Sequence, residues 1–116
     1  MNTELLIKTR DYIQANPREL AMMQWDCGTT ACICGHACRL AGKPLTVLLM
    51  GRYKQLAHCR AVLDLTLEQA RDLFFLDSWP TEFRYRYQIS TSLAEAANVA
   101  AERIDQFIAY HSAGVS

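Results

Sequence analysis

The chain lacks an excess of charge of either sign and lacks any long apolar run. Lysine plus arginine and aspartate plus glutamate number 12 each in 116 residues, so the formal net charge is zero. A balanced charge gives no general attraction for nucleic acid or an anionic membrane, which leaves only a local patch for such a role. No stretch of about 18 apolar residues exists to span a bilayer. The first residues also lack the features of a secretory signal. We therefore expect a soluble, cytoplasmic protein.

Proline and glycine are also scarce, at 3 and 5 residues, and hydrophobic residues make up 51% of the chain. This composition excludes a disordered or low-complexity chain. The length fits a single domain that can bury its own core. We find no internal repeat and no linker. The sequence therefore predicts one domain over residues 1–116, with a frayed tail at 112–116.

Apolar residues recur at helical spacing along most of the chain. Two capping boxes, Thr66 with Gln69 and Ser92 with Glu95, mark helix starts. Pro17 and Gly42 mark helix ends. The expected helices cover residues 3–15, about 30–42, about 45–51, 53–63, 66–76 and 92–111. The fold class is therefore a compact all-α domain of five or six helices.

The segment 80–90 follows a different pattern. Phe83, Tyr85, Tyr87 and Ile89 alternate with polar or charged residues, which is the period of a strand. Because no second segment offers a partner strand, we expect an irregular or briefly extended piece of ordered chain.

Cysteines are crowded into one short stretch: four of the five lie between positions 27 and 38, together with one of the three histidines. In a reducing compartment such cysteines are expected as free thiols or ligands rather than as disulfides. On a helix Cys32 and Cys34 point about 200° apart, so they cannot share an ion. The pairs on one face are Cys32 with His36, and Cys34 with Cys38.

This distribution of the cysteines over two helix faces still allows a zinc site. Cys27 precedes the helix and can fold back to join Cys32 and His36, and either His58 or Cys59 can complete four ligands. The stretch contains no Cys-x-x-Cys pair, which is the usual spacing in zinc sites. We therefore expect no cofactor, with zinc as the alternative.

Thiol catalysis is a second alternative. Cys27 or Cys32 lies near a helix N-terminus, where the helix dipole favours a thiolate, and Gly28 permits close approach of the backbone. A base is then required, which is His36 or His58.

Packing alone also explains the stretch. Free cysteine packs as a small apolar residue, so Cys34, Cys38 and Cys59 fit a core lined with Ile33 and Ala37. His36 is then satisfied by a backbone carbonyl. On this interpretation the chain is not an enzyme.

The chain resembles a family of small uncharacterised bacterial and phage proteins over roughly residues 16–79. The resemblance rests on "CGTTACICGHA", on "LDLTLEQARDLF" with the later "WP", and on these residues of the shared motif: Met22, Trp25, Cys27, Gly28, Thr29, Cys32, Gly35 and Ala37. Cys34 stands where the family has a small residue such as alanine, and His36 where it has an aromatic one. The family has no assigned activity, so the resemblance implies a fold and no reaction.

The segment "FRYRYQ" offers a last candidate site at Arg84, Tyr85, Arg86 and Tyr87. Interleaved arginine and aromatic residues suit a surface that stacks on single-stranded nucleic acid. The same residues suit contacts with an acidic protein. Because no catalytic set converges, the sequence predicts a non-catalytic binding module that acts through contacts with another protein, with a possible link to phage or mobile elements.

Overall fold

A computed structural model describes residues 1–23, 31–44 and 52–113 of the chain. In order these residues form α1 (Thr3–Ala15), η1 (Pro17–Glu19), α2 (Ile33–Leu40), α3 (Arg52–Leu63), α4 (Leu67–Phe74), η2 (Leu76–Ser78), α5 (Thr81–Gln88) and α6 (Leu93–Ala113). Across the described ranges there is no β-sheet, and a single isolated bridge pairs Leu20 with Ala31. The all-α prediction is confirmed. The helix expected at 45–51 lies outside the described residues.

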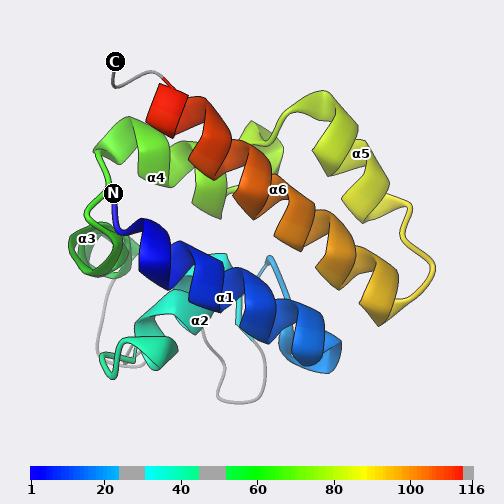
Figure 1. The fold of residues 1–116 in the computed structure, drawn as a ribbon, viewed down its shortest axis with the longest axis horizontal. Coiled ribbons are helices and arrows are strands. Elements are labelled where there is room, and N and C mark those ends of the chain that lie inside the picture. The colour runs from blue at the N-terminus through cyan, green and yellow to red at the C-terminus, as the bar shows by residue number, and fades with distance from the viewer. Residues whose placement is uncertain (24–30, 45–51, 114–116) are drawn as a thin grey trace.

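The long helix α6 organises the molecule. Figure 1 shows α6 beside α1, with α5 and α4 along its other side and α2 below α1. The core fills the space between these helices with side chains that have no exposed surface, including Leu6, Ile13, Ile33, Ile104 and Phe107. Small residues on α6, among them Ala97 and Ala100, are also fully or almost fully buried. A row of alanines lets the neighbouring helices approach α6 closely.

Local signals set several helix ends as the sequence predicts. Thr66 and Gln69 form the complete capping box at the start of α4. The Ser92 hydroxyl accepts the backbone N–H of Glu95 at 3.0 Å, whereas the Glu95 carboxylate accepts the N–H of Thr91. Gly42 has a φ of 73°, and the backbone N–H groups that follow α2 donate hydrogen bonds to carbonyls in the last turn of α2. This left-handed turn is the reason for glycine at the end of α2.

The prediction for residues 80–90 is wrong, because residues 81–88 form the helix α5. Phe83 and Tyr87 are one helical turn apart and pack partly buried against the core. Tyr85 and Ile89 are also one turn apart and are 61% and 51% exposed. An alternation of large residues therefore describes two opposite faces of a helix here, since positions four apart share a face.

The second helix is shorter than predicted, and two of its expected core residues are exposed. It begins at Ile33, with Cys32 as its N-cap, and ends at Leu40. Leu40 and Ala41 are exposed, while Ile33 and Ala37 are buried as predicted. None of the described helices is both long enough and apolar enough to cross a membrane.

Candidate functional site

The cysteine stretch meets a second helix through the Cys34 and Cys38 face. Cys34 of α2 and Cys59 of α3 are joined as a disulfide, with their Cα atoms 5.9 Å apart. The Cys38 Sγ lies 3.6 Å from the Cys59 Sγ. All three side chains are fully buried, as predicted for core residues. The expectation that these cysteines are unbonded thiols is wrong for Cys34 and Cys59. The sulfurs of Cys34, Cys38 and Cys59 are close enough together to hold a metal ion once that disulfide is reduced.

One ring nitrogen of His36 is held by the backbone of the connector after α1. Its Nε2 lies 2.7 Å from the Glu19 carbonyl oxygen, so the ring donates a hydrogen bond there. The same carbonyl accepts the N–H of Ala31 at 2.9 Å, and the His36 ring packs against the ring of Tyr12. The predicted backbone partner of His36 is confirmed. Its role is to fix η1 against α2.

The Tyr12 hydroxyl closes this contact by donating to the Glu19 carboxylate at 2.7 Å. That hydrogen bond raises the pKa of Tyr12, because the carboxylate stabilises the protonated phenol. The connector after α1 is therefore held by both the backbone and the side chain of Glu19.

The other predicted ligands and bases lie on different elements. His58 is half-buried, and its Nε2 contacts the Lys43 carbonyl at 2.8 Å. Cys32, expected near the start of the helix, is the N-cap residue itself and is only 2% exposed. Gly35 is buried within α2. Trp25, Cys27, Gly28 and Thr29 lie outside the described residues. Of the predicted zinc ligands, His58 therefore contacts the backbone, and the set of Cys27, Cys32 and His36 includes a residue outside the described ranges.

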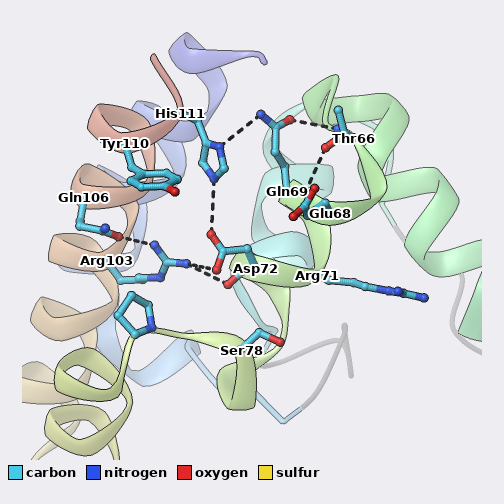
Figure 2. Close-up of a pocket in the computed structure, with 11 residues that line it drawn as sticks. Thr66, Glu68, Gln69, Arg71, Asp72, Ser78, Arg103, Gln106, Tyr110 and His111 are labelled. Carbon is cyan, nitrogen blue, oxygen red and sulfur yellow. Dashed lines mark hydrogen bonds and ion pairs between the residues drawn. The ribbon is translucent and has the colours of Figure 1, made fainter. Parts of the chain in front are cut away.

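A cleft of about 670 Å³, lined mainly by residues with polar side chains, lies between α4, η2 and α6. Figure 2 shows the side chains that line it, with Gln69 and Asp72 of α4 facing His111 and Arg103 of α6. The further lining residues are Thr66, Glu68, Arg71, Ser78, Pro80, Gln106 and Tyr110. Sequence reasoning did not single out this cleft.

The capping box at the start of α4 orients the histidine of the cleft. The Thr66 N–H donates to Gln69 Oε1 at 3.0 Å, so the Gln69 amide nitrogen points toward His111 (Figure 2). That nitrogen donates to His111 Nδ1 at 3.4 Å, and His111 Nε2 donates to Asp72 at 3.4 Å. Both ring nitrogens of His111 therefore have hydrogen-bond partners on α4.

Arg103 lies below this network and is 1% exposed. Its guanidinium donates to the Asp72 carboxylate at 3.0 Å and to the Asp72 carbonyl at 2.9 Å, and it also contacts Gln106. Burial lowers the pKa of Arg103, and the charge of Asp72 opposes that shift. Arginine nevertheless remains charged in proteins, so Asp72 balances a buried positive charge.

A signal for this buried arginine is present in the sequence. Arg103 falls between Ala100 and Phe107 on the apolar stripe of α6, where a charged residue needs a partner. The identity of that partner, Asp72, depends on how α4 packs on α6 and is not visible in the sequence.

The predicted aromatic and arginine residues lie on α5. Arg86 forms ion pairs with Glu102 of α6 and with Glu82, and Arg84 donates to the Asp77 carbonyl at 3.2 Å. The Tyr87 hydroxyl accepts the Met22 N–H at 3.4 Å. Burial raises the pKa of Tyr87, because the phenolate is the form that loses solvation.

Next to α5 a groove runs along α6. It is lined by Arg86, Ile89, Ser92, Ala94, Glu95, Asn98, Val99 and Glu102.

No protein-family model matches the chain, and no match is found among curated proteins or solved structures.

Proposed function

We propose that the protein is a non-catalytic binding module that engages a partner protein through the α5–α6 hairpin. The observation that carries the proposal is the exposure of three large apolar side chains spaced four residues apart: Tyr85 at 61%, Ile89 at 51% and Leu93 at 54%. Tyr85 and Ile89 are one helical turn apart, and Leu93 is the first residue of α6. Large apolar side chains exposed on such neighbouring turns favour a protein contact over a solvated surface. Tyrosine is also among the residues that contribute most at protein interfaces.

The charge of the adjoining groove indicates the chemistry of the partner. Glu95 and Glu102 lie on the groove together with Arg86, and Arg86 is already paired with Glu102 and Glu82. The groove lining therefore has two carboxylates and one guanidinium, and that guanidinium is already paired, so the lining has a negative excess. A segment with apolar residues on one side and lysine or arginine beside them complements this groove.

The same contacts disfavour the nucleic-acid alternative. Arg86 is ion-paired and Arg84 donates to a backbone carbonyl, so both guanidinium groups already have protein partners. Phe83 and Tyr87 pack against the core, which leaves Tyr85 as the exposed ring of the predicted segment. One ring does not make the series of stacking platforms that single strands require.

The test places a photo-crosslinking amino acid at position 85 in cells of the organism that encodes the chain. We expect one discrete crosslinked protein. A synthetic peptide from its crosslinked segment should bind the purified chain, more weakly at high salt. Ile89→Glu should weaken that binding about tenfold or more, because it puts a charge at the centre of an apolar contact. The matched control is Leu67→Glu on α4, since Leu67 is 38% exposed and distant in sequence.

Three results would contradict the proposal: no discrete crosslink, equal losses from Ile89→Glu and Leu67→Glu, or crosslinks to nucleic acid. A direct check is the binding of a single-stranded oligonucleotide at low salt. Salt-sensitive binding that falls when Arg84 and Arg86 become alanine would favour the nucleic-acid alternative. We expect no binding in that measurement.

A further inference from the structure

We propose that the reduced chain binds one soft metal ion of the Cu(I) class between Cys34, Cys38 and Cys59. The Sγ atoms of these residues all lie within 4.8 Å of one another. Cys34 and Cys38 are one turn apart on α2, and Cys59 belongs to α3. Each side chain is fully buried. Two packed helices thus present three sulfur atoms to one enclosed point.

The distances suit a shared ion once the disulfide is open. Sulfur atoms bound to one ion at about 2.3 Å lie about 3.8–4.0 Å apart. The Cys38 and Cys59 sulfurs are already 3.6 Å apart. The Cα atoms of Cys34 and Cys59 are 5.9 Å apart, so their sulfurs can separate by side-chain rotation while the helices stay in place.

The donor set selects the class of ion. Thiolates favour soft ions such as Cu(I), and zinc sites in proteins almost always complete four ligands. Within the described part of the chain this group consists of three cysteines, with no histidine or carboxylate. His58 is the neighbour of Cys59 but contacts the Lys43 carbonyl. Cys34 also lies in the first turn of α2, where the helix dipole stabilises a thiolate.

The disulfide and the ion exclude each other, because a sulfur in a disulfide is not a thiolate. A phosphine reductant converts one state to the other. Phosphorus supplies two electrons that break the bond between Cys34 and Cys59, and water supplies the two protons of the thiols and the oxygen of the phosphine oxide. The ion then displaces protons from the thiols as it binds.

The test uses the full chain, reduced with a phosphine under inert gas and freed of excess reductant. It is titrated with Cu(I) held by a chromogenic chelator. We expect one copper per chain in the native mass spectrum and three sulfur neighbours by X-ray absorption. The chain with its disulfide intact should take up no copper in competition with the same chelator.

Two variants separate this site from other cysteines. Cys38→Ser keeps the disulfide partners, so it can be purified folded and then reduced. We expect its Cu(I) affinity to fall about tenfold or more and its X-ray absorption to show two sulfur neighbours. Cys32→Ser is the control, because Cys32 is also buried at the start of α2 but is not in the group. It should bind as the parent chain does.

The proposal is overturned by several outcomes. One is a reduced, folded chain that fails to compete for Cu(I), and another is a Cys38→Ser variant that binds Cu(I) as tightly as the parent. Loss of binding in Cys32→Ser would place the ion elsewhere. Tight zinc binding with four protein ligands, seen as a tetrahedral Co(II) spectrum, would also overturn the three-sulfur site. None of these outcomes bears on the α5–α6 surface.

Discussion

Replacing Asp72 with alanine is expected to lower the free energy of unfolding by about 3 kcal/mol, because it leaves the charge of a buried arginine without its partner. Arg103 is 1% exposed, and its guanidinium donates to the Asp72 carboxylate at 3.0 Å. Asp72 itself is 34% exposed. That partial access to water places the expected loss at the lower end of values for buried ion pairs. Urea unfolding followed by circular dichroism measures it.

Replacing Arg103, the other partner of this ion pair, should cost less stability. In Arg103→Met the buried charge is gone, an unbranched apolar side chain fills part of its space, and Asp72 can turn to solvent. We expect a loss of about 1–2 kcal/mol. The double variant should therefore be more stable than Asp72→Ala alone.

A surface ion pair provides the control for this comparison of the two single variants and the double variant. Asp105 pairs with Arg10 at 2.7 Å but is 55% exposed, so Asp105→Ala should change stability by less than about 1 kcal/mol. If Asp72→Ala were as mild as Asp105→Ala, or if the two changes in the cleft simply added, the buried charge would not be what Asp72 balances.

The helices that the sequence predicts well are those with a local start or stop signal. The first helix has its predicted bounds, and α4 has its predicted capping box. These signals work because a cap and the residue it bonds are neighbours in the chain. Helix α5 is different: its aromatic residues alternate, and its ion pair with Glu102 comes from α6. Only the packed structure shows that this segment follows the helical period and not the strand period.

In the cysteine stretch, too, some features are predicted from the sequence and others depend on packing. The helical phase correctly separates Cys34 and Cys38 from Cys32 and His36, and it correctly predicts buried cysteines. The sequence does not show which part of the chain meets each face. Cys59 meets the first face and the Glu19 carbonyl meets the second, and both contacts depend on tertiary packing.

Replacing Trp79 with alanine is expected to cost about 3–5 kcal/mol of stability, the range for truncation of a buried aromatic residue. Trp79 is 3% exposed. Its indole N–H donates to the Leu73 carbonyl at 2.8 Å, near the end of α4, where helix carbonyls lack partners. Its ring packs edge-on against Tyr87 of α5, at 5.6 Å between centroids. The lost contacts and the cavity both favour the unfolded chain.

The effect of Trp79→Ala should be largest on α5. That helix has no fully buried residue of its own, so its attachment to the core depends on contacts such as that between Trp79 and Tyr87. Hydrogen exchange of the α5 amides should accelerate beyond that of α1. Trp79→Phe keeps a ring but loses the hydrogen bond, and we expect an intermediate loss of about 1–2 kcal/mol. Equal exchange in α5 and α1 would contradict this role of Trp79.

Comparing Trp79→Ala with Ile89→Glu separates a loss of stability from a loss of partner binding at the proposed surface. Ile89 is 51% exposed, so Ile89→Glu should weaken partner binding while urea unfolding stays within about 0.5 kcal/mol of the parent chain. Trp79→Ala should weaken both, because it releases the helix that presents Tyr85. If Trp79→Ala loosened α5 and left partner binding unchanged, the partner would have to contact a different surface. The pair of variants therefore tests whether the core holds α5 in place for that contact.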